Sequence, residues 1–228
     1  MHSSGSEGGR LETFCCYVYG SVHIKYPPLD KIGKIVDQVD YVLLEGVKMN
    51  KKGTLFVLVF PLLITFLVYK GIIRLITLLN KNMRGKADME VLKRFFEERG
   101  KPVEIADYEL YDLIKKKPKL TVSISSLQLI CSLFLLYSIL LIFLENKLNL
   151  FLLLHNIAKL FLLNMLAFSF FVSKTKNTRD ELLIKRVTEL RNRGYKCVFI
   201  ARGKDHIKFI KAELEKIGVL VVDIVSKK

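Results

Sequence analysis

The side chains best suited to chemistry are two histidines in a Gly-x-x-His motif that occurs near both ends of the chain. One copy runs from Gly20 to His23 and the other from Gly203 to His206. Each follows an apolar, β-rich run, at 14–19 and at 197–201. The carboxyl ends of parallel strands line one edge of a sheet, where ligands bind, so we expect both imidazoles at one site. A single histidine after a strand is more often structural, and the repeat therefore carries this prediction.

Carboxylates and an arginine fall at comparable positions. Glu45 ends the apolar run 41–44, and Asp107 follows a third apolar run. Two histidines and a carboxylate form a set that binds a divalent metal with open positions for water. Arg179 could neutralise a carboxylate or an oxyanion, and Asp180 could simply cap the next helix. Exposed, purely structural side chains are the alternative for each of these residues.

The positions of these residues depend on strand and helix units that recur along the chain, a pattern typical of a parallel α/β sheet flanked by helices. The expected strands are 14–19, 41–44, 102–106, 196–201 and 219–222, and the expected helices are 29–39, 89–100, 181–193 and 207–217.

Three apolar segments interrupt this pattern. Val122 to Leu144 carries no charge and exceeds the roughly 20 residues needed to cross a bilayer. Leu148 to Val172 is similarly long, and the two segments predict a transmembrane helical hairpin inserted in the α/β domain. Leu55 to Leu79 contains Pro61, Lys70 and Arg74, so we expect an interfacial or packed helix. Burial in a soluble protein is the alternative, and it suits only this last segment.

The composition supports a membrane protein. Hydrophobic residues make up 51% of the 228 residues, charged residues 26%, and the net charge is +15. Lysines flank the apolar segments, which favours cytoplasmic membrane flanks over nucleic-acid binding. An even number of crossings would keep both motifs on that side. No Cys-x-x-Cys pair is present, which argues against structural zinc and allows a reducing compartment.

The chain accordingly divides into a disordered tail (1–11), a first α/β part (12–121, with 55–79 inside it), a transmembrane hairpin (122–172) and a second α/β part (173–228).

The order of Gly20–His23, Glu45, Asn177–Asp180 and Gly203–His206 resembles the TraB/PrgY family, which is grouped with TIKI-type proteases and erythromycin-esterase-like enzymes. Residues 84–107 are also similar to that family's middle helix and following strand. The resemblance implies a sheet of two related halves, each giving one Gly-x-x-His motif to a shared cleft. TIKI proteins are metal-dependent proteases, TraB proteins are associated with the shutdown of peptide pheromones, and the esterase-like relatives use histidine without an established metal.

The same resemblance implies His23, Glu45, Arg179 and His206 as site residues. The chain departs from the family at 46–48, where relatives usually add an acid and an arginine, and at Lys204, which puts a cation beside His206. The hairpin also interrupts the domain, whereas relatives often carry their membrane helices at the carboxyl end.

We therefore expect a membrane-anchored, metal-dependent hydrolase, a peptidase, on the cytoplasmic side. His23, Glu45 and His206 would bind manganese or zinc, and Arg179 would stabilise the oxyanion. Gly20, Gly203, Asp107 and Asp180 complete the expected site as binding residues. The alternatives are a non-catalytic, membrane-bound protein that binds a peptide or signal, and a basic membrane scaffold. Expected partners are the membrane and a peptide or signalling ligand; a homo-oligomer is allowed and nucleic acid is not expected.

Overall fold

A five-stranded parallel sheet forms the centre of the α/β part, as the sequence predicts. The computed structural model describes residues 14–22, 25–46, 70–79, 87–108, 110–144 and 150–224. The strands are β1 (Cys15–Ser21), β2 (Tyr41–Leu44), β3 (Val103–Ile105), β4 (Cys197–Gly203) and β5 (Leu220–Asp223). Their order is β3-β2-β4-β1-β5, and every neighbouring pair is parallel.

The central strand of the sheet comes from the carboxyl-terminal part of the chain. In β4, Val198 lies between Cys16 of β1 and Tyr41 of β2. All but the last of its residues are buried, as expected for a strand covered on both faces. The segments on either side of the long apolar helices therefore build one sheet.

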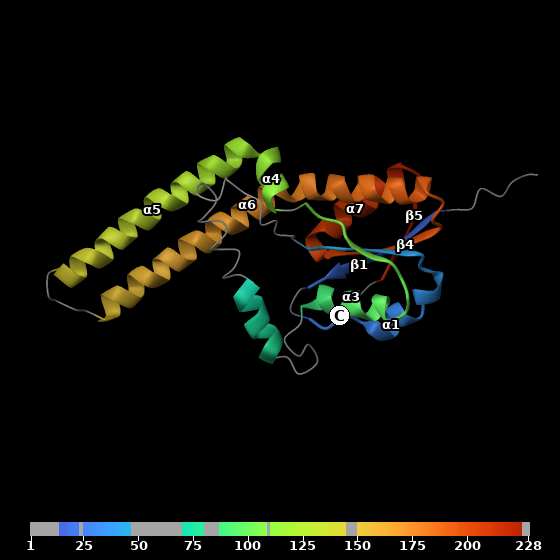
Figure 1. Cartoon of the computed structure of the whole chain (residues 1–228), viewed down its shortest axis with the longest axis horizontal. Helices are drawn as coiled ribbons and strands as arrows, with labels where there is room; N and C mark the ends of the chain where they lie inside the picture. The colour runs from blue at the N-terminus through green and yellow to red at the C-terminus, as the bar shows by residue number, and fades with distance from the viewer. Residues whose placement is uncertain are drawn as a thin grey trace, which may run out of the picture.

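Helices cover both faces of the sheet (Figure 1). On one face, the second half of α6 (Leu150–Asn192) and α7 (Lys204–Lys216) pack against alternate residues of β4, Val198 and Ile200. On the other face, α1 (Leu29–Gly33), a 3-10 turn (Val36–Gln38) and α3 (Asp88–Glu97) cover Phe199 and Ala201. The alternation follows from the two-residue period of a strand.

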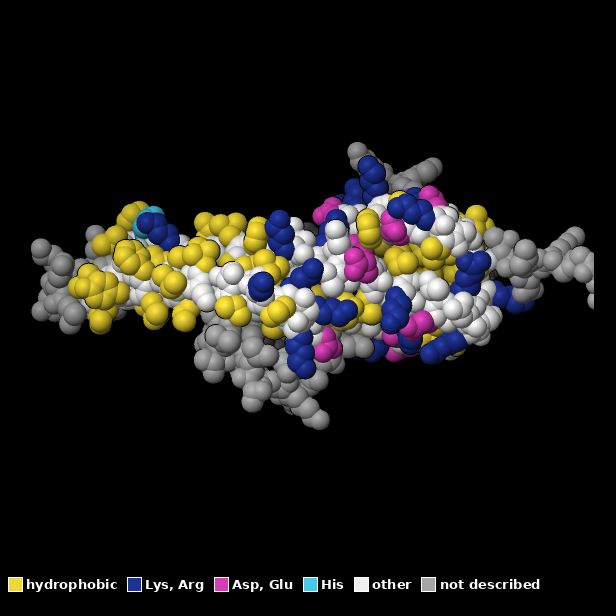
Figure 2. Space-filling model, turned by 90° about the horizontal axis from the view of Figure 1, so that it is seen from above, with side chains coloured by type: hydrophobic (Ala, Val, Ile, Leu, Met, Phe, Trp, Pro, Cys, Tyr) yellow, Lys and Arg dark blue, Asp and Glu magenta, His cyan; other side chains and the backbone are white. Residues whose placement is uncertain are grey.

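Two long apolar helical segments extend away from the sheet side by side (Figure 1). They are α5 (Pro118–Leu144), which follows the short α4 (Leu110–Lys116), and the first half of α6. Their most apolar windows have mean hydropathies of 2.1 and 1.7, and only 17% and 11% of them is buried. Hydrophobic side chains cover this arm, whereas charged side chains gather over the α/β part (Figure 2). By length and composition, both helices can cross a membrane.

The structure corrects the predicted end of the second apolar helix. The sequence predicts an apolar helix that ends at Val172 and a separate helix from Glu181, but α6 is one helix across this stretch. Residues 173–180 contain neither glycine nor proline, so nothing in them breaks the helix. Asp180 lies inside α6, and the prediction that it caps a helix is wrong.

Several predicted segments lie outside the described residues: the tail 1–11, the motif histidine His23, most of the third apolar segment (55–69) and the turn 145–149. The described end of the third segment, 70–79, is helical and exposes Leu75, Leu78 and Leu79. The helix predicted over 29–39 divides into α1 and the 3-10 turn.

A disulfide joins the two strands at the middle of the sheet. Cys15 of β1 and Cys197 of β4 are directly opposite each other, with their Cα atoms 4.7 Å apart. Sequence spacing did not indicate this pair, because 182 residues separate the two cysteines, and the bond argues against the reducing compartment that the cysteine pattern allowed. The bond lies at the amino ends of the strands, opposite the edge that carries the candidate site.

Candidate functional site

The carboxyl edge of the sheet holds a group of buried charged side chains, called here the ion cluster. Its members are Glu45 after β2, Asp107 after β3, Arg202 in β4, Arg179 and Asp180 in α6, and His206 in α7. All six are buried. Three of the predicted site residues, Glu45, Arg179 and His206, thus lie at one edge of the sheet together with two of the predicted binding residues, Asp107 and Asp180.

Arg179 links the two carboxylates that follow β2 and β3. Its Nε donates to Asp107 Oδ1 at 3.0 Å, and its Nη2 donates to Glu45 Oε1 at 2.7 Å and to Asp107 Oδ2 at 2.5 Å. Burial alone would lower the pKa of Arg179, but its hydrogen bonds and ion pairs with Asp107 and Glu45 raise that pKa above its usual value. The guanidinium is therefore always charged. Among the described residues, these bonds use Nε and Nη2.

Arg202, near the end of β4, forms hydrogen bonds to α6 and to the residue that follows β3. Its Nη1 donates to Asp107 Oδ2 at 3.0 Å, and its Nη2 donates to the backbone oxygen of Arg179 at 3.0 Å. Its Nε lies 3.5 Å from Asp180 Oδ1, a distance that gives an ion pair but no good hydrogen bond. The side chain is fully buried. Because a buried charge requires compensation, Arg202 fixes the spacing of β3, β4 and α6 around it.

Glu45 is held as a carboxylate. Burial alone would raise its pKa, but the charges of Arg202 and Arg179, together with the backbone N–H of Gly203, lower that pKa to about 2. The Gly203 N–H donates to Glu45 Oε2 at 2.5 Å. Glu45 is thus ionised at any physiological pH.

His206 is oriented by Asp180. The His206 Nδ1 lies 2.7 Å and 2.9 Å from the two oxygens of the Asp180 carboxylate, so we assign the hydrogen to Nδ1, which donates to them. The other ring nitrogen, Nε2, then carries a free lone pair. It lies 4.0 Å from Glu45 Oε1. An aspartate that orients an imidazole in this way is a common arrangement in acid–base catalysis.

The second Gly-x-x-His motif has a simple structural basis. Gly203 ends β4 and precedes the first residue of α7, so His206 falls in the first turn of that helix and turns back toward the sheet edge. Lys204 is exposed and does not point into the ion cluster. In the first motif, a Cβ added to Gly20 would lie 3.1 Å from Ile207 Cγ1, so this glycine allows β1 and α7 to pack closely.

The ion cluster does not fit a divalent metal. Glu45 Oε1 and His206 Nε2 are both potential ligands, but a guanidinium nitrogen lies 2.7 Å from that carboxylate oxygen. A second guanidinium neighbours Asp107 and Asp180, the remaining acids. Within the described residues, no group of three His, Cys, Asp or Glu side chains is arranged to hold a metal ion. Because His23 is outside them, the manganese or zinc site at His23, Glu45 and His206 stays a prediction.

Arg202 is the cluster residue that the sequence analysis missed. Its signal was available, since an arginine follows the uninterrupted apolar run of β4 and directly precedes the second motif. A charge at that position must be buried or must end the strand, and here it is buried. Asp107, expected as a minor binding residue, instead contacts both arginines.

Comparisons with protein-family models, with curated proteins and with solved structures give no match for this chain.

Proposed function

We propose that the chain is a membrane-anchored hydrolase that cleaves an amide or ester bond, with His206 as the proton acceptor. Its resemblance to the TraB/TIKI group favours a peptide bond as the target. The observation that carries this proposal is the Asp180–His206 pair at the carboxyl edge of the sheet. Asp180 fixes the imidazole and leaves Nε2 available to take a proton. Ligands of open parallel sheets bind at this edge.

The chemistry follows from two acceptors that can share one water. His206 Nε2 and Glu45 Oε1 are 4.0 Å apart, so one water oxygen can lie within hydrogen-bond distance of both. Nε2 takes one proton as the water oxygen attacks the substrate carbonyl carbon. The carbonyl oxygen becomes an oxyanion, which the guanidinium of Arg179 stabilises. The imidazolium then returns its proton to the leaving nitrogen or oxygen as the scissile bond breaks.

The membrane anchor in this proposal is the pair formed by α5 and the first half of α6. Two crossings keep the strands before and after the pair on one side, as a single sheet requires. Basic residues flank the outer ends of the pair, at 115–119 and at 174–176. These basic flanks favour the cytoplasmic side for the α/β part with both Gly-x-x-His motifs, whereas the Cys15–Cys197 disulfide favours the opposite, oxidising side.

A non-catalytic, membrane-bound peptide or signal receptor is the second candidate. The ion pairs inside the ion cluster favour this function, because Arg179 and Arg202 are both buried and paired with carboxylates of the same cluster. In this case the cluster shapes the edge of the sheet, and a ligand binds above it without reaction. Binding without turnover would identify this function.

The test compares the full chain in lipid nanodiscs with two histidine variants. Fluorogenic peptide and ester libraries are assayed for turnover, with and without added manganese or zinc. His206→Gln should lower turnover by about 100- to 10,000-fold, the usual contribution of a positioned general base. His155→Gln, on the membrane arm, is the matched control and should leave turnover unchanged. Equal turnover in His206→Gln would refute the proposal, and peptide binding without any turnover would establish the receptor.

A further inference from the structure

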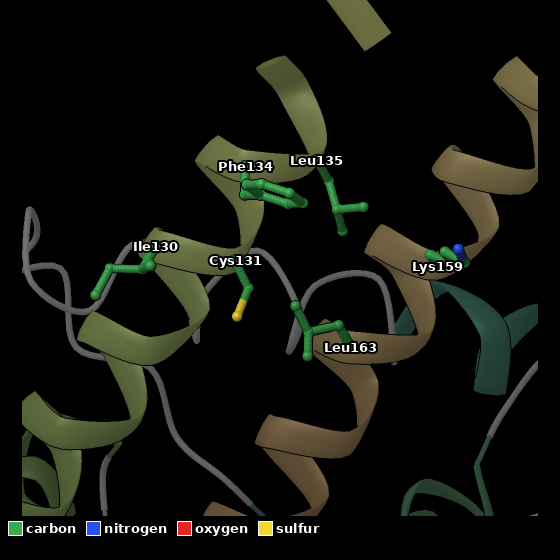
Figure 3. Close-up of a pocket in the computed structure, with 6 residues that line it drawn as sticks. All are labelled: Ile130, Cys131, Phe134, Leu135, Lys159 and Leu163. Atoms are coloured by element: carbon green, nitrogen blue, oxygen red, sulfur yellow. The ribbon is translucent and has the colours of Figure 1, made fainter. Parts of the chain in front are cut away.

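An open groove on the membrane arm lies between α5 and α6. It has a volume of about 470 Å³ and is open on one side. Its lining, drawn in Figure 3, is Ile130, Cys131, Phe134 and Leu135 from α5, with Lys159 and Leu163 from α6. This volume is within the range of small-molecule sites, roughly 300–1,000 Å³. Five of the six lining side chains are apolar, so the groove suits a hydrocarbon ligand.

Lys159 is the exception, and its position is unusual for a cation. It lies nine residues after the start of α6, or about 14 Å along the helix axis at 1.5 Å per residue. Lys174, at the other end of the apolar part, is about 22 Å away by the same rise. With α6 in a bilayer, the Lys159 backbone is inside the hydrocarbon core, which is about 30 Å thick. Its ammonium requires an anion or the headgroup layer.

The described helices of the arm supply no anion to Lys159, and Glu145 is in the turn 145–149, outside the described residues. Residues 118–144 and 150–173 contain no Asp or Glu. The described helices of a second copy's arm would likewise bring no carboxylate to this depth, only a second lysine. A lipid phosphate is the anion that the surroundings of the arm offer in abundance.

We propose that this groove binds an anionic phospholipid, with one acyl chain between α5 and α6 and its phosphate paired with Lys159. The proposal rests on the membrane anchorage proposed above and does not depend on catalysis. The apolar lining matches the acyl chain, and the single lysine matches the phosphate. His155, one helical turn from Lys159 and stacked on Phe151, provides a second polar group beside the headgroup. An anionic lipid is preferred to a zwitterionic one because its headgroup carries no cation that competes with Lys159 for the phosphate.

The test uses fluorescence, because the chain contains no tryptophan. Phe134→Trp places one reporter in the groove, and Phe161→Trp, on α6 but outside the groove lining, places one against bulk lipid as the matched control. Each variant of the full chain is put in nanodiscs that contain a minor fraction of brominated phosphatidylglycerol or of brominated phosphatidylcholine. Bromine quenches tryptophan only at short range.

We expect brominated phosphatidylglycerol to quench the groove reporter with at least a threefold higher relative affinity than brominated phosphatidylcholine, and the control reporter to show no preference. Lys159→Gln should abolish the preference, whereas Lys159→Arg should keep it. Cys131→Phe, which fills the groove and leaves the lysine in place, should reduce quenching by both lipids. A preference that survives Lys159→Gln, or equal quenching by the two lipids, would overturn the proposal.

A second copy in the groove is the competing occupant. Cys131 lines the groove, so mild oxidation of the nanodisc-bound chain would give a dimer linked through Cys131 if two grooves faced each other. Cys131→Ser would remove that dimer. Such a dimer, together with lipid-independent fluorescence, would refute lipid binding here without affecting the proposed hydrolase, which is measured by turnover.

Discussion

Replacement of Glu45 by glutamine tests the electrostatics of the ion cluster. The structure lowers the pKa of Glu45 from 4.5 to about 2. At about 1.4 kcal/mol per unit, ionised Glu45 contributes about 3 kcal/mol to the free energy of unfolding. The side chain is buried, so solvent screens this contribution little.

The contribution depends on pH in a defined direction. Because the pKa is lower in the folded state than in the unfolded state, the stabilisation is complete above pH 4.5 and is lost as the pH falls toward 2. Glu45→Gln is neutral at all pH values and retains hydrogen-bonding atoms for Arg179. It should therefore be about 3 kcal/mol less stable than the parent at pH 7 and nearly equal to it at pH 2.

Urea unfolding in mild detergent, followed by circular dichroism at several pH values, measures this difference. Glu97→Gln is the control, since Glu97 forms an exposed pair with Lys93 at 3.6 Å and should change stability by less than about 1 kcal/mol. If the parent and Glu45→Gln lose stability in parallel between pH 7 and pH 2, Glu45 is not held ionised by its buried neighbours.

Three further changes probe the rest of the site and the sheet. Arg202→Met leaves buried carboxylates uncompensated and should cost about 3–5 kcal/mol in urea unfolding; a loss below 1 kcal/mol would contradict its role. Asp180→Asn should lower turnover by at least about 100-fold, because an amide no longer fixes the tautomer of His206, and should also lower the melting temperature, because Asp180 is an ion-pair partner of the buried Arg202; unchanged turnover would argue against the pair. Cys15→Ser should lower stability by about 2–4 kcal/mol under non-reducing conditions, and dithiothreitol should then have no further effect; Cys131→Ser is the control.

The sequence predicts the sheet better than it predicts the order of its strands. Each strand is a short apolar run followed by a polar residue, and that pattern was enough to place Glu45 and Asp107 at the carboxyl edge. The position of β4 between β1 and β2 depends on which buried faces fit together, as in the pairing of Val198 with Cys16 and Tyr41. Such long-range packing leaves no local signal in the chain.

The ion cluster was only partly predictable for a related reason. Arg179 and Asp180 were recognised as candidates, but polarity at 173–180 was interpreted as a break between two helices. Helix continuity requires only that no residue breaks the backbone hydrogen bonds, and a polar stretch satisfies that condition. The consequence is structural: one helix, α6, carries both the membrane arm and two cluster residues.

Proline at position 177 distinguishes one helix from two. In two separate helices, with Asp180 as the cap of the second, residue 177 would lie in the linker and Asn177→Pro would be tolerated. In the continuous α6, proline removes an internal hydrogen bond and clashes with the preceding turn, at a cost of about 3 kcal/mol or more.

Arg179 and Asp180 follow within one turn of position 177, so Asn177→Pro should also displace the ion cluster. The hydrogen-exchange protection of β4 should then fall. Mass spectrometry on the full chain in nanodiscs measures this protection. Asn177→Ala, at the same exposed position, should leave that protection unchanged or slightly increased, since alanine favours the helix. Native-like protection in Asn177→Pro would show that the arm and the cluster are held independently. Loss of protection in the proline variant alone would show that the helix crossing from the arm into the α/β part positions the cluster.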